Sequence, residues 1–155
     1  MGSEISAEEF MNLAGKELAP SSWITLSQER VNQFANCTDD RQFIHTDPER
    51  MKDTELGTTI AHRFLSLSLT SAHGPEDWPT VQNTRMLLNY GLDKVRFICP
   101  VKVGSRVRFL TKIESIVEKK PGHLLVKAVK TLEVEGQADP AMIAETLGMI
   151  VLDLD

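Results

Sequence analysis

The sequence contains only two cysteines, and it lacks both a long apolar run and an excess of basic residues. Cys37 and Cys99 have neither C-x-x-C spacing nor enough partners for a disulfide framework, and the acidic, polar start Met1–Phe10 is unlike a secretory signal. We therefore expect a reduced, cytoplasmic protein. No stretch approaches the roughly 18 apolar residues that a membrane span requires, so we expect no membrane span. With 17 basic and 22 acidic side chains and a net charge of −5, the chain has no electrostatic signature of nucleic-acid binding.

The composition is otherwise that of an ordinary globular chain. Its 155 residues are 41% hydrophobic and 25% charged, with 9 glycines and 7 prolines, which is enough apolar material for a core. This length predicts a single domain over residues 1–155. Near its start, Ser6 and Glu9 have the spacing of a capping box, and Phe10 and Leu13 follow at helical intervals. We therefore expect an N-terminal helical extension over residues 1–20.

Two further helices are indicated by caps and periodicity. After the brief strand predicted at Trp23–Leu26, Ser27 has the position of an N-cap for a helix that ends near Cys37. Later, the segment Ile60–His73 is apolar or small on every side, and Arg63 is its one formally charged residue. A surface helix would show a charged stripe, so this pattern is typical of a helix enclosed by other structure.

The second half of the chain predicts a long antiparallel sheet. Extended segments separated by turn residues are expected at Lys94–Val101, Arg106–Val117, Leu124–Val134 and Met142–Leu152, whereas Thr84–Tyr90 fits a helix or a strand equally well. The third segment alternates most clearly, with Leu124, Val126, Ala128, Leu132 and Val134 on one face and Lys127, Thr131, Glu133 and Glu135 on the other. The expected fold class is α+β, with the sheet curled around the central, largely apolar helix.

The loop over residues 38–57 contains the candidate chemistry. Asp40 and His45 lie five residues apart, and an imidazole that titrates near neutral pH beside a carboxylate is an acid–base pair. As isolated residues, both are better explained by a capping or surface role, and Asp47 before Pro48 is best explained as a helix cap. His45, His62 and the nearby aspartates lack the spacings of known metal motifs, so we expect no metal.

The order of these residues resembles the hydratase motif of the MaoC-like dehydratases. The resemblance lies in Asp40 to Arg50, Gly57 to His62 and Phe64 to Leu67, and it continues through Leu88 to Leu92, Lys94 to Phe97, Pro100-Val101 and Val103 to Ser105. It covers most of the chain from about residue 23 onward. The branch that contains nodulation protein N and related (R)-specific enoyl-CoA hydratases is the most similar. The family implies a hot-dog fold, in which an antiparallel sheet wraps a central helix.

The resemblance also implies roles for individual residues. Asp40 and His45 are expected to hold the water that adds to C3 of a trans-2-enoyl thioester, giving an (R)-3-hydroxyacyl product. A backbone N–H at the start of the central helix, at the position of Arg63, is expected to polarise the thioester carbonyl. His62 and Ser71 are candidates for supporting this site, although a serine that bonds back to its own helix is an equally good interpretation of Ser71. The family further implies sites at a dimer interface, and hence a homodimer.

Arg63 is a departure from the family pattern, which has glycine there. The backbone N–H survives, but the side chain could crowd the thioester, pair with the carboxylate of Asp40, or contact an anionic acyl group or a phosphate. The first functional hypothesis is therefore reversible hydration of an enoyl thioester carried by coenzyme A or an acyl-carrier protein. One alternative is a non-catalytic acyl-thioester-binding protein or the partner subunit of a heterodimeric dehydratase. Another is a thioesterase, for which the sequence has no feature beyond the shared fold.

The remaining expectations concern the substrate. Ile60 and Ala61, which precede Arg63, and Lys94 and Arg96, which lie near a turn, are candidate substrate-binding residues, the latter two for the phosphates of coenzyme A. For each of the two basic residues, a solvated strand face is the alternative. No cofactor is expected, since coenzyme A enters as part of the substrate.

Overall fold

A long antiparallel sheet is the main element of the fold. The computed structural model describes residues 2–154. The sheet has the strand order β2-β5-β6-β7-β4, and its strands are β2 (Ile24–Thr25), β4 (Thr84–Phe97), β5 (Arg106–Lys120), β6 (His123–Val134) and β7 (Met142–Leu152). Every neighbouring pair is antiparallel, as predicted. The segment Thr84–Tyr90, which the sequence left open, is the first half of β4.

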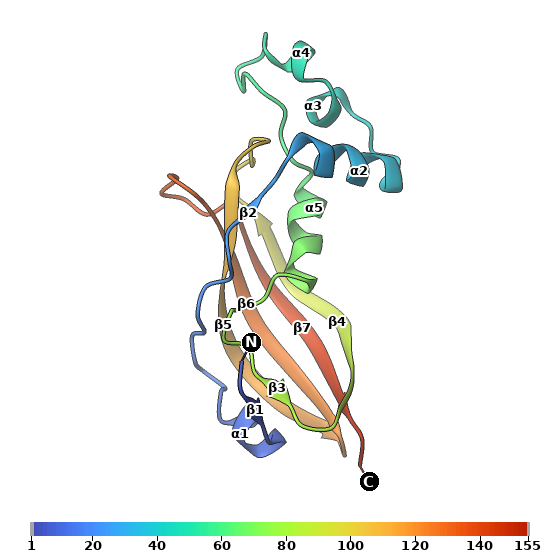
Figure 1. Ribbon diagram of the computed structural model, residues 1–155, viewed down its shortest axis with the longest axis vertical. Helices are drawn as coiled ribbons and strands as arrows, with labels where there is room; N and C mark the ends of the chain where they lie inside the picture. The colour runs from blue at the N-terminus through green and yellow to red at the C-terminus, as the bar shows by residue number, and fades with distance from the viewer. Residues whose placement is uncertain (1, 155) are drawn as a thin grey trace.

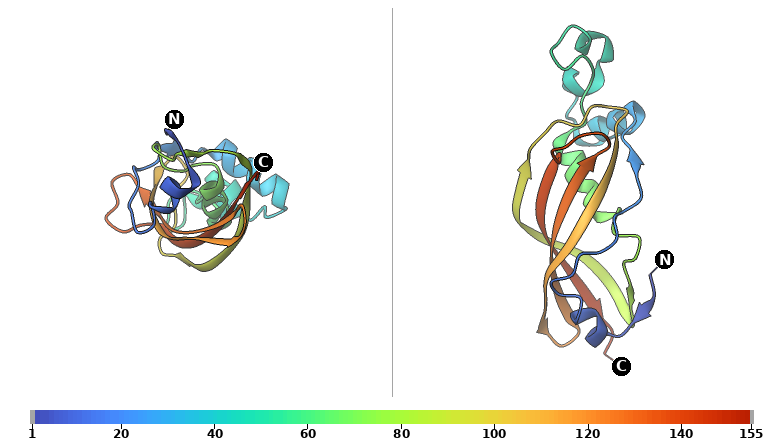
Figure 2. Two further views of the ribbon diagram at one scale, coloured as in Figure 1. Left: turned by 90° about the horizontal axis from the view of Figure 1, so that it is seen from below. Right: turned by 90° about the vertical axis from the view of Figure 1, so that its left-hand side faces the viewer.

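The central helix lies on the concave side of this sheet (Figures 1 and 2). It consists of α5 (Arg63–Ser68), continued by the 3₁₀ turn η1 (Leu69–Ser71), and is shorter than the predicted Ile60–His73. The helix starts at Arg63 rather than Ile60 because Ile60 forms a β-bridge with Lys102, and because the amide of Ala61 donates to the carbonyl of Val101 at 2.8 Å. These contacts hold the chain extended up to the helix.

The sheet does not enclose the helix on all sides. Leu65 is buried in the main core against β-strand residues such as Phe109 and Met142, whereas the side chain of Phe64 on the other side of α5 is 69% exposed. Within one chain, the expectation of a helix covered on every side is therefore wrong for the side that carries Phe64.

Three short helices gather at the end of the molecule where α5 begins (Figure 1). They are α2 (Gln28–Thr38), α3 (Phe43–Thr46) and α4 (Pro48–Met51). The predicted caps are confirmed: the Ser27 hydroxyl accepts from the Arg30 amide at 3.2 Å, and the Asp47 carboxylate accepts from the Arg50 amide at 3.0 Å. The helix α3 was not predicted, since it has no side-chain cap.

The N-terminal segment packs at the opposite end. The capping box of Ser6 and Glu9 is present and starts α1 (Ala7–Met11), and β1 (Glu4–Ile5) pairs in parallel with β3 (Thr80–Val81). The predicted helical extension over residues 1–20 is wrong beyond α1, because residues 15–21 run along β5 instead. The amides of Gly15, Leu18 and Ser21 donate to carbonyls of β5, at 2.8 to 3.0 Å. This segment therefore covers the edge of β5.

No helix of residues 2–154 is long and apolar enough to cross a membrane.

Candidate functional site

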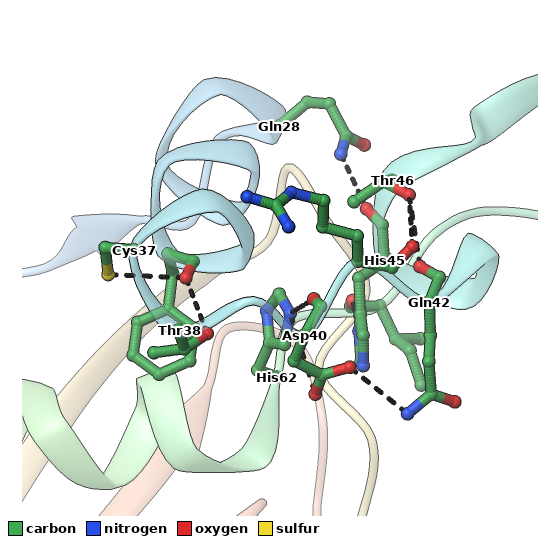
Figure 3. A network of polar contacts seen from close by, with 11 residues as sticks. Gln28, Cys37, Thr38, Asp40, Gln42, His45, Thr46 and His62 are labelled. Carbon is green, nitrogen blue, oxygen red and sulfur yellow. Dashed lines mark hydrogen bonds and ion pairs between the residues drawn. The ribbon is translucent and has the colours of Figure 1, made fainter.

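His45 is buried in α3 and fixed at its ring and its backbone (Figure 3). Its Nδ1–H donates to the carbonyl of Ile60 at 2.7 Å. Because a carbonyl only accepts, this bond places the hydrogen on Nδ1 and leaves Nε2 of the neutral ring as an acceptor. Burial lowers the pKa of His45 below its usual value, the bond to Ile60 opposes this shift, and the neighbouring His62 adds to it. His45 is therefore set up to accept a proton rather than to carry one.

Gln28, the first residue of α2, holds the backbone of His45. Its side-chain amide donates to the carbonyl of His45 at 2.7 Å, and its Oε1 accepts from the hydroxyl of Thr59 at 2.6 Å. Thr59 is fully buried and immediately precedes Ile60, which bonds the imidazole. Gln28 thus ties α3 to the segment before α5. No local pattern in the sequence indicates this role, because the partners are 17 and 31 residues away.

Asp40 lies in the turn between α2 and α3. Asp39 ends α2 in the left-handed conformation, with φ of 62°, and so reverses the chain there. The Asp40 carboxylate accepts from the side-chain amide of Gln42 at 3.2 Å, and its main-chain carbonyl accepts from His62 Nε2–H at 2.9 Å. The Asp40 side chain remains 43% exposed, so one side of the carboxylate faces open space.

The structure brings Asp40, His45 and His62 together. One side-chain ligand atom from each of these residues lies within 4.8 Å of the others. A water between a carboxylate oxygen and an imidazole nitrogen can hydrogen-bond to both over such a span, because each bond is about 2.7–3.2 Å long. The predicted Asp40 and His45 pair is thus close enough to share one water.

His62 contacts both His45 and Asp40. Its ring is stacked on that of His45, with centroids 3.8 Å apart and an interplanar angle of 23°, and it also contacts the ring of Phe34. Since His62 Nε2–H is used by the carbonyl of Asp40, its Nδ1 is an acceptor, and this buried atom has no partner among residues 2–154. His62 therefore links the two predicted catalytic residues.

The same three residues are the group that could hold a metal ion in the described part of the chain. Spacing in the sequence did not reveal this grouping. Nδ1 of His45 and Nε2 of His62 are engaged with carbonyls, so Nε2 of His45 and Nδ1 of His62 are the ring nitrogens left to bind a water or an ion.

The start of α5 lies directly after His62. This N-cap residue makes no side-chain hydrogen bond to the first turn, so the amides of that turn have no side-chain acceptor there and no intrahelical one. The side chain of Arg63 is exposed, and its guanidinium carbon lies 5.8 Å from the ring centre of Phe97. No ion pair joins Arg63 to Asp40 within residues 2–154, so that alternative for Arg63 is not realised.

The other candidate residues lie farther from the pair. The amides of Ile60 and Ala61 already donate to the carbonyls of Ile44 and Val101, so neither is free for a substrate. Ser71 lies at the far end of the helix, where its hydroxyl accepts from the side-chain amide of Asn89 at 3.2 Å rather than bonding back to the helix. Two residues of β4, Lys94 and Arg96, are exposed.

Comparisons with known proteins place this geometry in one family. The model of the MaoC like domain matches residues 9–136. The chain is 42% identical to 3-hydroxyacyl-thioester dehydratase Z of Mycobacterium tuberculosis, over 92% of this chain and 93% of that protein. It is 40% identical to nodulation protein N of Rhizobium leguminosarum, over 97% and 94%.

The fold has solved counterparts. The (R)-hydratase from A. caviae has a TM-score of 0.70 and 21% identity, covering 86% of this chain and 95% of that one. The curled sheet around α5 is thus the hot-dog fold that the resemblance implied. With the family model matched over most of the chain and relatives near 40% identity, the chain belongs to the MaoC-like family of thioester dehydratases and hydratases.

Proposed function

We propose that this protein catalyses the reversible hydration of trans-2-enoyl thioesters to (R)-3-hydroxyacyl thioesters. The observation that carries the proposal is the approach of the Asp40 carboxylate and the His45 imidazole to within 4.8 Å, next to the start of α5. The printed name of the Mycobacterium tuberculosis relative, a 3-hydroxyacyl-thioester dehydratase, describes the same reaction type in the reverse direction.

The proposed mechanism uses the groups described above. A water hydrogen-bonds to Asp40 and to Nε2 of His45, and one member of the pair takes a proton as the water oxygen attacks C3. The π electrons of the C2–C3 bond move toward the thioester carbonyl, whose oxygen accepts a hydrogen bond from the backbone N–H of Arg63. The pair then returns a proton to C2, so that one molecule of water is added overall.

The hydration assay tests this proposal. Loss of the enoyl absorbance of a short trans-2-enoyl-CoA is followed for the wild type, Asp40→Asn and His45→Ala, and both variants are expected to lose about 10²- to 10⁴-fold in rate. Asp39→Asn is the matched control, because it removes an exposed neighbouring carboxylate at a position whose left-handed backbone asparagine tolerates. Equal rates for Asp40→Asn and Asp39→Asn would contradict the mechanism.

Arg63→Gly separates catalysis from the non-catalytic alternative. Since the Arg63 side chain extends toward Phe97 and does not pair with Asp40, we expect the wild type to be active and Arg63→Gly to change its rate less than about tenfold. A silent wild type with an active Arg63→Gly would favour a binding role or a partner subunit instead.

We propose that the active form is a homodimer joined along β4. The edge of β5 is covered by β2 and by residues 15–21, whereas β4 pairs only with β7 among the described strands. Five large apolar side chains of β4 are more than a third exposed: Met86, Leu87, Leu88, Tyr90 and Leu92. An edge strand of this kind favours pairing with another chain. Light scattering should give a dimer for the wild type and a monomer for Leu87→Lys, whose side chain is 65% exposed.

The carrier of the acyl group is proposed from charge alone. Lys94 and Arg96 extend from β4 into solvent and are available to the phosphates of a coenzyme A or acyl-carrier thioester. No cofactor or metal is required by this mechanism.

A further inference from the structure

The inward face of β6 contains one residue that does not fit an apolar core. Side chains on this face come from every second residue, and five of them are buried apolar groups: Leu124, Val126, Ala128, Leu132 and Val134. Lys130 occupies the remaining position of this row. A lysine in such a row costs desolvation energy unless its ammonium is paired.

The ammonium of Lys130, a partly exposed residue, has few acceptors within the chain. It has three donors, and Nζ donates to one acceptor, the carbonyl of Thr70 at 2.6 Å. In the part of the chain that the structure describes, no carboxylate forms an ion pair with it. Lys127, on the outward face of the same strand, is the contrast, because its ammonium lies within 3.3 Å of Asp93, Glu114 and Glu145. Burial accordingly lowers the pKa of Lys130.

Lys130 also lines a large cavity. This cavity of about 790 Å³ lies between α5 with η1 and the strands β4, β6 and β7, and Lys130 is the one charged side chain among its lining residues. It starts at Phe64, next to Arg63 whose amide is assigned to the thioester carbonyl, and follows the helix to Thr70 and Ala72. From Arg63 to Thr70 the helical rise is roughly 10 Å, which is within reach of a medium-length acyl chain.

We propose that Lys130 binds a carboxylate at the far end of the acyl chain, so that the substrate class is the enoyl thioester of a dicarboxylic acid. This inference rests on the proposed hydratase function, and it assigns the cavity to the acyl chain. A carboxylate would supply the acceptors that the ammonium lacks, in a cavity with no other charge to oppose it. A role of Lys130 limited to capping the last carbonyls of the helix would give no discrimination between substrates.

The test compares matched substrates with the purified full-length protein. Initial rates are measured for trans-2-hexenoyl-, octenoyl- and decenoyl-CoA and for the corresponding monothioesters whose terminal methyl is replaced by a carboxylate. At the length that reaches Lys130, kcat/KM is expected to be about ten- to a hundredfold higher for the carboxylate substrate, the size of effect of a charge-assisted hydrogen bond.

Variants assign this preference to Lys130. Lys130→Met should lose the preference through KM, and Lys130→Arg should retain it. Lys112→Met, which removes an exposed lysine of β5, should leave the preference unchanged. If a variant does not fold, the ratio of kcat/KM between carboxylate and alkyl substrates in the wild type still tests the proposal.

The outcomes separate the two proposals. A wild type that hydrates alkyl substrates as well as or better than carboxylate substrates at every length would overturn the role of Lys130 and leave the hydratase proposal intact. A preference that survives in a folded Lys130→Met would also overturn it. A wild type that hydrates neither series would overturn the hydratase function itself.

Discussion

Replacing Gln28 by leucine should destabilise the protein and misplace its catalytic imidazole. The change removes the acceptor of the Thr59 hydroxyl, which is 1% exposed, and the donor to the His45 carbonyl. A buried hydroxyl without a partner costs about 1–3 kcal/mol, and the lost bond to the carbonyl adds about 1 kcal/mol. The expected loss of unfolding free energy is therefore about 2–4 kcal/mol, or about 5–15 °C in Tm for a chain of this size.

The catalytic effect should be visible separately. Because Gln28 holds His45 without touching the substrate, Gln28→Leu should lower kcat by about ten- to a hundredfold with little change in KM. Urea unfolding and enoyl-CoA hydration are measured for this variant and for Gln33→Leu, an exposed glutamine of the same helix with one long bond of 3.4 Å to Glu29. The control should lose less than about 0.5 kcal/mol.

A double variant provides the strictest check. Adding Thr59→Val to Gln28→Leu removes the orphaned hydroxyl, so part of the lost stability should return, with a coupling energy of about 1–2 kcal/mol. If Gln28→Leu were as stable and as active as Gln33→Leu, the positioning role of Gln28 would be refuted.

Four further outcomes are expected from the local chemistry. Because burial lowers the pKa of His45, the acid limb of kcat/KM should lie below pH 6.5; an acid limb above pH 7 would contradict this. The same shift makes the unfolded chain bind more protons below that pH, so unfolding free energy should decrease as pH falls from 6.5. Ser27→Ala should cost about 1 kcal/mol in urea unfolding, since it removes the cap on the Arg30 amide, and a loss below 0.3 kcal/mol would argue against that cap. Dialysis against a chelator should leave the hydration rate unchanged, whereas a loss restored by zinc would make Asp40, His45 and His62 a metal site.

Local signals accounted for the elements whose cause is local. The capping box at Ser6, the caps at Ser27 and Asp47 and the alternation of β6 are all present, because each depends on residues within a few positions of one another. The prediction failed where distant contacts decide. The prediction of a helical extension over residues 1–20 fails beyond α1, because β5 offers residues 15–21 backbone partners about ninety to a hundred residues away.

The candidate site divides in the same way. Asp40 and His45 could be named from their motif, yet the motif carried no geometry. Three contacts depend on how α2, α3 and α5 meet at one end of the sheet. They are the contacts of His62 with Asp40 and His45, the hydrogen bond from Gln28 to His45, and the approach of the Arg63 side chain to Phe97. The catalytic role of Asp40 and His45 stays a prediction until the variants are assayed. The single domain and the cytoplasmic location also stay predictions.

The sequence by itself determined the family and most of the strand pattern, and it named Asp40 and His45 as the candidate pair, because motif order and hydrophobic periodicity are properties of the chain. Only the tertiary structure decided that the outer edge of β4 stays unpaired among residues 2–154 and that Lys130 faces a cavity. The alternation of β6 already placed Lys130 on its inward face. Whether such a lysine meets a carboxylate or an open space depends on strands and a helix that only folding brings together.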